Sequence, residues 1–342
     1  MQKKLFFILL CVLIVGCGRP HQPLNQLTKI DEFFGAVVKV DVCYETRQGE
    51  ALTKALDEVW ARFADIHRRM SVYDKDSDIN RINNSYPQSA QVQADTYALI
   101  KDSMDYYQIS EGVFDISIGP LLSLWKESEK RNSLPTKDEI RQTQAKMGIE
   151  NIRLLEANRI QLLKEGFKIN IDSIGDGFAA DEAARILRSH GFKNFLVDAS
   201  GELFAGGHNC QGRKWRIGVR DPLDSAKIID VIELSDAAAS TSGNHERYYT
   251  IQGKHWSHIV NPLTGFPSRD ILSATVVAPS AQFADFWSTA LCLLDVKKGG
   301  VLTESFGDGC ASMVVFKDSR DSVKRMESRN YKKFQKRTGL FQ

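Results

Sequence analysis

The segment from Ala284 to Ala290 carries two side chains whose types and spacing suit metal chemistry. Asp285 and Thr289 lie four residues apart where a helix is expected to begin, so both side chains project from one helix face. A carboxylate and a hydroxyl are hard oxygen ligands, which suit Mg²⁺, an ion that keeps several waters and binds jointly with phosphates. The alternative is that Asp285 only complements the helix dipole from the first turn.

Residues 169–191 have the pattern of a strand, a turn and a helix. The turn is rich in glycine, serine and aspartate and contains Ser173 and Asp176, and the helix is expected to run through Arg188. This geometry directs backbone N–H groups and a helix N-terminus towards an anion. The segment lacks the P-loop lysine, so it is not a Walker A motif.

Polar residues and histidines gather in residues 238–267. Residues 246–251 and 255–260 predict two strands, and residues 252–254 suit the hairpin turn between them. Asn261-Pro262 ends the second strand, and the small residues before the hairpin let a ligand approach the backbone closely. The pattern indicates a rigid platform for a site, with a plain surface hairpin as the alternative.

Helices and strands are both expected around these segments. Apolar residues at helical spacing predict a long amphipathic helix over residues 50–70. Residues 113–118 predict a short apolar strand ended by Gly119-Pro120, and its one carboxylate, Asp115, either satisfies backbone donors or binds a ligand. The other expected elements are a strand at 36–44, a helix at 95–110, a loop at 126–136, a helix at 137–147, a strand meander at 152–171, a strand–turn–strand at 195–204, strands at 215–219, 228–234, 237–240 and 272–278, a helix at 296–306, a strand at 311–316 and a solvated basic tail at 324–336.

The N-terminal residues have the pattern of a secretory signal. Lys3 and Lys4 form a positive region, and Leu5–Val15 is an apolar run too short for a spanning helix. Ile14-Val15-Gly16-Cys17 resembles the bacterial lipobox, which implies a mature protein that begins at Cys17 and carries diacylglycerol there. An uncleaved signal anchor is the alternative.

This pattern places the protein in the bacterial cell envelope, held to a membrane by lipid and facing the periplasm or the exterior. It predicts a signal peptide at residues 1–16, a lipidated tether at 17–30 and a single domain at 31–342.

The composition is that of a soluble globular protein, with 42% hydrophobic and 26% charged residues. Without Lys3 and Lys4, 43 basic residues face 43 acidic ones. This balance gives no basic stripe, so we expect no nucleic-acid partner. The cysteines outside the signal and the lipobox are Cys43, Cys210, Cys292 and Cys310, an even number that permits disulfides without fixing their pairing.

Several motifs together resemble the ApbE family, the FAD:protein FMN transferases. Ser240-Thr241-Ser242-Gly243 and SHIVNPLTGFP at 257–267 match the family's S/T-S-G and s-H-x-x-(D/N)-P-x-T-G-x-P. The resemblance recurs in family order and covers roughly residues 35–326; the further segments are MSVYDKDSDINRIN at 70–83, GVFDISIGPLLSLW at 112–125, SIGDGFAAD at 173–181 and ADFWSTA at 284–290.

The resemblance implies a mixed α/β (α+β) fold, a single ApbE-like domain with largely antiparallel sheets and flanking helices. It also implies a set of residues that bind FAD and a set that binds Mg²⁺, with Trp125 in the core. The FAD set is Tyr73, Val113, Phe114, Asp115, Asn170, Asp176 and Val260, with a structural rim position as the alternative for Tyr73; the metal set is Ser173, Asp285, Ser288 and Thr289.

The chain departs from the family pattern at several positions. The family's M-G-T near the first strand is absent, Asn170 replaces an acidic residue, and Asp198 and Ser200 depart from N-x-G-G. The edge of the flavin pocket is therefore expected to differ.

The resemblance implies transfer of FMN from FAD to a Ser or Thr hydroxyl of an acceptor protein, with release of AMP. The implied acceptor carries a D-G-x-(S/T)-x-A-T motif, as respiratory flavoprotein subunits do. This chain has no such motif, so we expect it to act in trans, on another protein. We expect His258 to be the general base, because imidazole titrates near neutral pH; a structural bond to the neighbouring turn is the alternative. His245 and His255 are expected on the hairpin surface.

Two other functions remain open from the sequence. One is an FAD-binding lipoprotein that stores FAD or hydrolyses it to FMN and AMP, and the other is a structural envelope lipoprotein. Analysis of the products separates them from a transferase.

Overall fold

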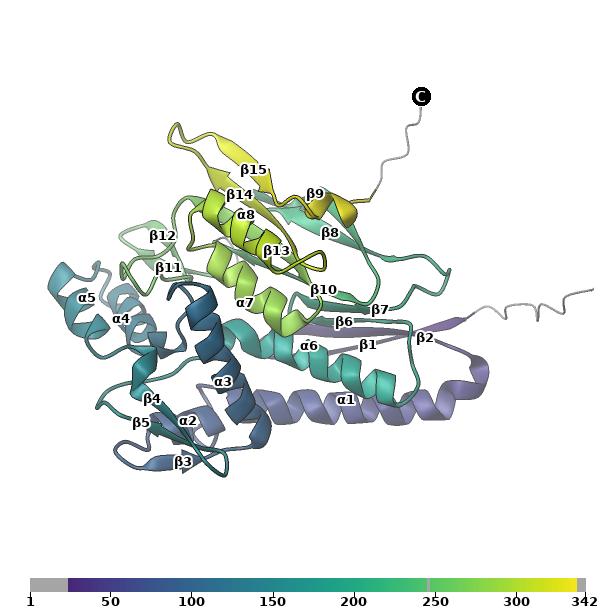
Figure 1. Ribbon diagram of the computed structural model, residues 1–342, viewed down its shortest axis with the longest axis horizontal. Helices are drawn as coiled ribbons and strands as arrows, with labels where there is room; N and C mark the ends of the chain where they lie inside the picture. The colour runs from purple at the N-terminus through teal and green to yellow at the C-terminus, as the bar shows by residue number, and fades with distance from the viewer. Residues whose placement is uncertain (1–23, 245–246, 337–342) are drawn as a thin grey trace, which may run out of the picture.

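An antiparallel sheet of eight strands forms the centre of the computed structural model, which describes residues 24–244 and 247–336 (Figure 1). Its strands follow the order β1, β2, β6, β7, β10, β13, β14, β15, so the two chain segments farthest apart lie at opposite edges. The strands are β1 (Asn25–Phe33), β2 (Ala36–Tyr44), β6 (Phe195–Ala199), β7 (Glu202–Gly206), β10 (Ala237–Gly243), β13 (Ile271–Ala278), β14 (Ala311–Lys317) and β15 (Val323–Glu327).

Both faces of this sheet are covered. Along β10, Ala238 packs into the core on the helical side, while its neighbours Ala237 and Ala239 pack into the core on the other side. This alternation follows from the two-residue period of a strand, and it explains why β10 and β13 consist of small and apolar residues throughout. The second face is covered by the hairpin of β8 (Trp215–Asp221) and β9 (Asp224–Leu234) and by Tyr331.

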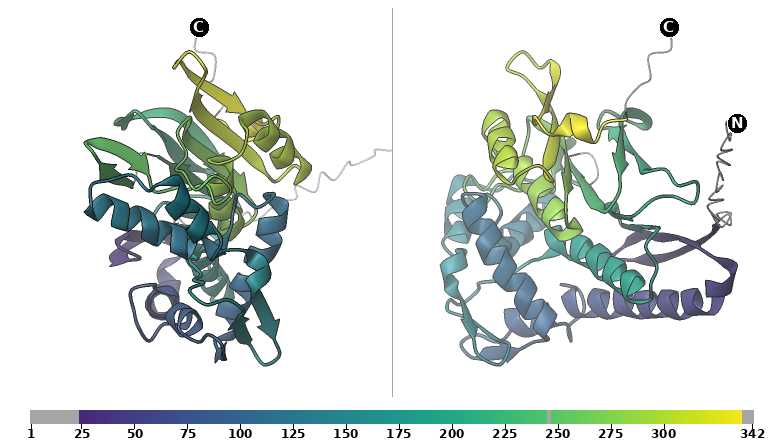
Figure 2. Two further views of the ribbon diagram at one scale, coloured as in Figure 1. Left: turned by 90° about the vertical axis from the view of Figure 1, so that its left-hand side faces the viewer. Right: turned by 45° about the vertical axis from the view of Figure 1, so that its right-hand side comes forward.

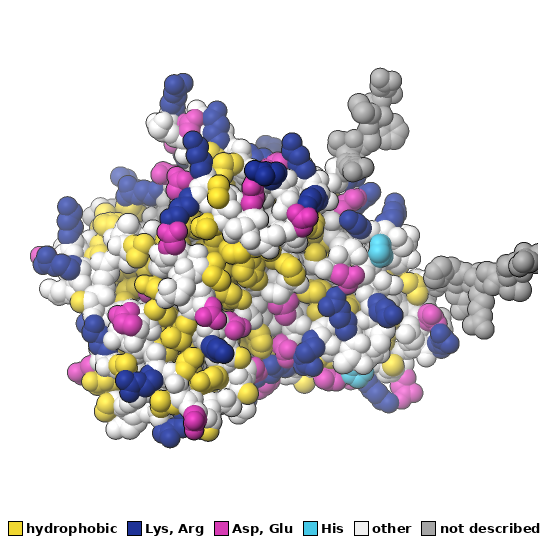
Figure 3. Space-filling model, in the orientation of Figure 1, with side chains coloured by type: hydrophobic (Ala, Val, Ile, Leu, Met, Phe, Trp, Pro, Cys, Tyr) yellow, Lys and Arg dark blue, Asp and Glu magenta, His cyan; other side chains and the backbone are white. Residues whose placement is uncertain are grey.

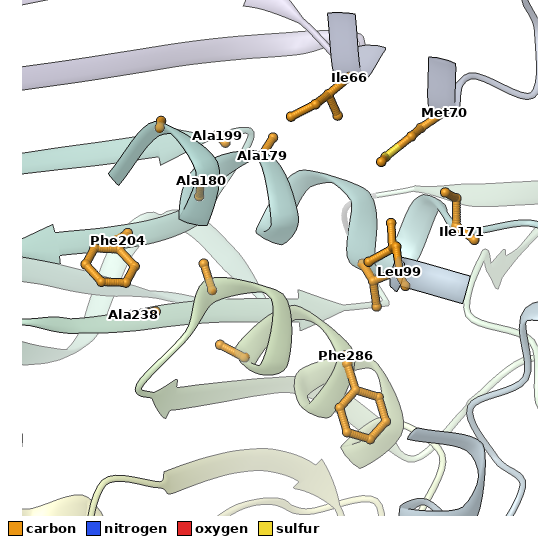
Figure 4. Close-up of a cluster of buried hydrophobic side chains, with 14 of the residues drawn as sticks. Ile66, Met70, Leu99, Ile171, Ala179, Ala180, Ala199, Phe204, Ala238 and Phe286 are labelled. Carbon is orange, nitrogen blue, oxygen red and sulfur yellow. The ribbon is translucent and has the colours of Figure 1, made fainter. Parts of the chain in front are cut away.

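Three helices cover the first face: α1 (Gly49–Met70), α6 (Asp172–Ser189) and α7 (Ala281–Leu291). Figure 4 shows Ala179 and Ala180 of α6 among side chains from α1, α7 and the sheet. Small side chains let the helices approach closely, and Gly177 marks the tightest point. A Cβ there would lie 2.5 Å from the carbonyl oxygen of Ala281, so only glycine fits between α6 and α7.

Most of the remaining elements gather at one end of the large sheet (Figure 2). They form a small sheet, a short hairpin and a set of helices: β3 (Ser89–Gln91), β4 (Ile152–Leu155), β5 (Arg159–Leu162), β11 (Tyr248–Ile251), β12 (Lys254–Ser257), α2 (Asp78–Asn83), α3 (Ala94–Ile109), α4 (Gly119–Lys130) and α5 (Lys137–Gln144). Helix α8 (Val296–Ser305) instead packs against β14 and β15.

Most predicted elements are confirmed, among them the long helix α1, the helix α5 and the β11–β12 hairpin. Gln252 and Gly253 occupy its turn with φ of 53° and 70°, the conformation that two-residue hairpin turns favour. The hairpin strands are shorter than predicted, because β12 ends at Ser257.

Other predicted elements were wrong. The domain begins before residue 31, because β1 starts at Asn25 and pairs with β2, so the predicted tether at 17–30 overlaps a strand. Residues 113–118 form no strand; a 3-10 turn occupies Ile116–Ile118. Gly119-Pro120 begins α4 instead of ending a strand, because proline is well suited to the first helical turn. The helix continues to Lys130 and so occupies part of the predicted loop at 126–136.

The predicted turn around Ser173 is also wrong, because α6 already begins at Asp172. The strand meander at 152–171 ends at Leu162. The predicted basic tail contains β15 and the fully buried Tyr331, so part of it belongs to the core.

Within the described residues a disulfide joins Cys43 of β2 to Cys210, which follows β7. Cys292 and Cys310 are buried. The predicted signal peptide, lipobox and Cys17 lie outside the described residues, as does His245. Within the described part of the chain, no helix has the length and apolar character needed to cross a membrane.

Candidate active site

A cavity of about 490 Å³ lies where α6, α7 and β10 meet the β11–β12 hairpin and the start of α4. Its volume is in the range of ligand sites. Nearly all the predicted site residues line it: Tyr73, Val113, Phe114, Asp115, Asn170, Ser173, Asp176, His258, Val260, Asp285 and Thr289. These residues come from five separate segments of the sequence, which the fold brings to one place.

Asp285 is held at the cavity by the contact between α6 and α7. The backbone N–H of Gly177 donates to the Asp285 carboxylate at 3.1 Å. One turn further along α6, Asp181 accepts from the N–H groups of Ala281 and Gln282, which begin α7. The carboxylate of Asp285 is therefore placed by both helices, and its side chain is 5% exposed.

Several hydroxyl groups line the same cavity as this carboxylate. The Thr289 hydroxyl lies 3.2 Å from that of Ser242 on β10, and Ser173 lines the same cavity from α6. Ser288 differs, because it is fully buried, hydrogen-bonds to Ser240 and Ser242, and does not line the cavity. The structure thus brings three of the four predicted metal ligands together.

The donor set fits Mg²⁺. A carboxylate and two hydroxyls offer oxygen ligands only, and the small number of protein ligands leaves positions for water and phosphate oxygens, as Mg²⁺ prefers. Among the described residues no cluster of three or more His, Cys, Asp or Glu side chains has a metal-binding arrangement. Zinc, which prefers nitrogen and sulfur, is therefore a poorer match for this donor set.

His258 follows β12 and lines the cavity. Its Nδ1 lies 2.9 Å from the carbonyl oxygen of Arg247, and its backbone N–H donates to the same oxygen. A carbonyl oxygen only accepts, so Nδ1 carries the proton and Nε2 carries the lone pair. Burial lowers the pKa of His258 below its ordinary value of 6.5, and the Arg247 charge lowers it further against the effect of this hydrogen bond. The imidazole is therefore neutral at pH 7.

The motif that follows His258 builds the turn that holds it. The Asn261 side chain accepts from the N–H groups of Leu263 and Thr264, and Gly265 adopts φ of 77°. Trp125 of α4 donates from its indole to the Gly265 carbonyl at 2.9 Å. A Cβ at Gly265 would meet Ile140 at 2.2 Å, so glycine is required for this close packing. Trp125 is fully buried, as predicted.

The other end of the cavity is apolar and aromatic. Val113 and Phe114 are almost fully buried in its wall, while Tyr73 is 83% exposed at its rim. Asp115 accepts from the N–H of Ser117 at 2.7 Å, and burial raises the pKa of its carboxyl against this bond. Asp115 thus satisfies a backbone donor and lines the cavity at the same time.

Asp176 and Asn170 lie in the wall near the start of α6. Burial raises the pKa of Asp176 to about 7, with a further contribution from Asp172, and the Arg247 charge opposes the shift. The Asn170 side chain accepts from the N–H of Asp172 and donates to the Asp172 carboxylate. Asn170 therefore helps to begin the helix that carries Ser173 and Asp176.

Sequence reasoning missed several residues of the cavity wall. Asn83 exchanges two hydrogen bonds with the backbone of Ile169, and Asn80 donates to the carbonyls on either side of Tyr73. Both asparagines lie inside the matched segment 70–83, so the motif itself was the signal. Arg247 and Lys168 line the cavity without any such signal.

Comparisons with known proteins agree with this architecture. Residues 34–314 match the ApbE family. The FAD:protein FMN transferase of Escherichia coli is 30% identical over 273 residues, which cover 78% of this chain and 77% of that protein. The protein of the same name from Vibrio cholerae is 28% identical over 340 residues, which cover 98% of this chain and 99% of that protein.

Solved structures show the same fold. The flavin transferase ApbE from Vibrio cholerae has a TM-score of 0.79 at 26% identity, covering 91% of this chain and all of that one. The ApbE protein from Thermotoga maritima has a TM-score of 0.81 at 28% identity, again covering 91% of this chain and all of that one. The predicted mixed α/β fold with antiparallel sheets is confirmed, and the chain belongs to the ApbE family.

Proposed function

We propose that this protein is an FAD:protein FMN transferase that moves FMN from FAD to a Ser or Thr hydroxyl of an acceptor protein and releases AMP. The observation that carries the proposal is a single cavity that contains both the oxygen ligand set on α6 and α7 and a neutral histidine with a defined tautomer. The names of the relatives supply the substrate.

Phosphoryl transfer asks the protein mainly to position groups and to neutralise charge. The aromatic end of the cavity, with Phe114 and Tyr73, would hold the flavin. Asp285, Thr289 and Ser173 would hold Mg²⁺, which when bound neutralises the charge of the pyrophosphate. His258 would accept the proton of the acceptor hydroxyl at Nε2 as the new O–P bond forms and the bond to AMP breaks.

The proposal is tested with purified protein, FAD, Mg²⁺ and a peptide that carries a D-G-x-(S/T)-x-A-T motif. We expect mass spectrometry to show the peptide gaining FMN while one AMP is released for each modified peptide. Release of AMP together with free FMN would identify a pyrophosphatase instead, and unchanged FAD would leave only a binding function.

The proposed location is the cell envelope, with a lipid anchor at Cys17. The disulfide between Cys43 and Cys210 supports export, because disulfides persist in oxidising compartments. On the face shown in Figure 3, basic and acidic side chains are interspersed, without a stripe of one sign. This face therefore has no basic stripe of the kind that binds nucleic acids.

Changing Cys17→Ala is expected to leave the precursor without lipid and uncleaved at this position, because the lipobox cysteine is the acceptor of the diacylglycerol group. Metabolic labelling with palmitate in a bacterial host measures the result. Acylation equal to that of the unchanged protein would contradict the predicted anchor.

A further inference from the structure

Arg247 contributes to the cavity through both its backbone and its side chain. Its carbonyl oxygen lies 2.9 Å from Nδ1 of His258, and its side chain lines the cavity together with Asp176 and His258. Its positive charge lowers the pKa of both of these groups.

Two other cationic side chains among the described residues line the cavity, and neither is placed in this way. The Lys126 ammonium lies 5.5 Å from the centre of the Tyr73 ring, at the aromatic end. Lys168 packs its backbone against Gly119, at the start of α4. Arg247 is thus the cation that acts on the part of the cavity around His258.

The guanidinium of Arg247 keeps its donors available. Within residues 24–244 and 247–336 it forms no ion pair or side-chain hydrogen bond, whereas Arg62 and Arg69 each pair with two or more carboxylates. An arginine presents five N–H donors in a planar fork that matches phosphate oxygens. A solvent-facing arginine at the edge of a cavity is well placed to use them on a ligand.

The cavity needs such a cation. The described carboxylates that line it outnumber the cationic side chains; they are Asp115, Asp172, Asp176, Glu202 and Asp285, against Lys126, Lys168 and Arg247. Bound Mg²⁺ would offset part of this negative charge, and a cationic side chain near the pyrophosphate would offset more of it.

We propose that Arg247 is a further catalytic residue, whose guanidinium binds the phosphoryl group that is transferred, next to His258. This inference rests on the proposed function. As the acceptor oxygen bonds to the FMN phosphorus, its proton passes to His258 Nε2, and the P–O bond to AMP breaks with the electron pair leaving on AMP. Negative charge on the phosphoryl oxygens is then met by the guanidinium.

One residue thereby links two parts of the reaction. The backbone carbonyl of Arg247 fixes the tautomer of the base, and its side chain meets the charge that the base helps to create. The backbone contact survives substitution of the side chain, so the two contributions can be separated by mutation.

The test compares Arg247→Met, Arg247→Lys and Arg247→Ala with the unchanged protein. In Arg247→Met we expect kcat for FMN transfer to fall by about 10²–10³-fold, the usual loss for one transition-state contact. The dissociation constant for FAD should change by less than about 10-fold, since the charge to be met develops mainly during the reaction. Arg247→Lys should recover part of the rate.

Chemical rescue distinguishes this role from a structural one. Guanidinium chloride at low millimolar concentration should raise the rate of Arg247→Ala and leave the unchanged protein unaffected. Arg269→Met is the matched control, because Arg269 packs on the Trp256 ring of the same hairpin, 4.7 Å from its centre, and does not line the cavity. It should retain its rate.

An unchanged kcat in Arg247→Met, or a higher KM at constant kcat, would overturn the inference. AMP release is measured alongside peptide modification, so that failure of the proposed function is visible separately. If the unchanged protein releases AMP without modifying the peptide, the acceptor is water and the Arg247 variants are compared on AMP release. If it releases no AMP at all, both proposals are wrong.

Discussion

His258→Asn lowers the rate of FMN transfer by about 10²–10⁴-fold, the range expected for a lost general base. In the unchanged protein, Nδ1 of His258 lies 2.9 Å from the carbonyl oxygen of Arg247. The asparagine side chain of the variant can still donate a hydrogen bond to this oxygen. It offers no lone pair of suitable basicity for the acceptor proton. Binding of FAD should change little, because the role proposed for His258 is to deprotonate the acceptor.

The rate of FMN transfer should also depend on pH through the protonation of His258. Burial and the Arg247 charge lower the pKa of His258 below its ordinary value of 6.5, so the imidazole is neutral, and therefore basic, at neutral pH and gains a proton only on the acid side of that value. The rate of the unchanged protein should be level near pH 7–8 and fall as the pH drops through this lowered pKa. The matched control is His255→Asn, an exposed residue stacked edge-on against Tyr248, which should behave like the unchanged protein. Normal rates and the same acid limb in His258→Asn would assign the base to another group.

Asp285→Ala is expected to reduce transfer by at least about 10³-fold, because loss of the one carboxylate of the proposed Mg²⁺ ligand set would remove several kcal/mol of charge stabilisation. The fold should persist, since α6 and α7 remain joined through Asp181 and the start of α7. The Gly177 N–H loses its acceptor, which should lower thermal stability slightly. Transfer is measured over a range of Mg²⁺ concentrations, with circular dichroism as the check on folding.

A carboxylate near the site but outside it provides the control. Asp295 caps α8 by accepting from the Lys298 N–H and does not line the cavity. Asp295→Asn should keep both the rate and the Mg²⁺ dependence. Full activity of Asp285→Ala at limiting Mg²⁺ would exclude Asp285 as a main ligand.

Local patterns in the sequence predicted the elements of this protein better than their ends. Helix α1 and the β11–β12 hairpin were predictable because periodicity and turn residues act over a few neighbouring positions. The start of α6 was missed because glycine and serine usually mark a turn, while here Gly177 serves the contact with α7. That requirement comes from a helix a hundred residues later in the chain.

In the site, too, local spacing was predictable and contacts between distant segments were not. The i, i+4 spacing of Asp285 and Thr289 was enough to place them on one face of α7. The departure of Ser288 from the cavity was not predictable, because it depends on Ser240 and Ser242 in the neighbouring strand. Arg247 was not predicted for a similar reason, since an arginine next to a hairpin strand is ordinary until its neighbours in the fold are known.

The cross-link between Cys43 and Cys210 also sets an order of events in the biogenesis of the protein. The two cysteines are 167 residues apart, and β2 can pair with β6 only after most of that length has left the ribosome. A chain crossing a membrane N-terminus first would present Cys43 as a lone thiol until Cys210 emerged. Closing so long a loop can stabilise the fold by up to about 5 kcal/mol. Protein produced in a reducing cytoplasm would lack this contribution. Protein exported to an oxidising compartment should therefore have the larger free energy of unfolding.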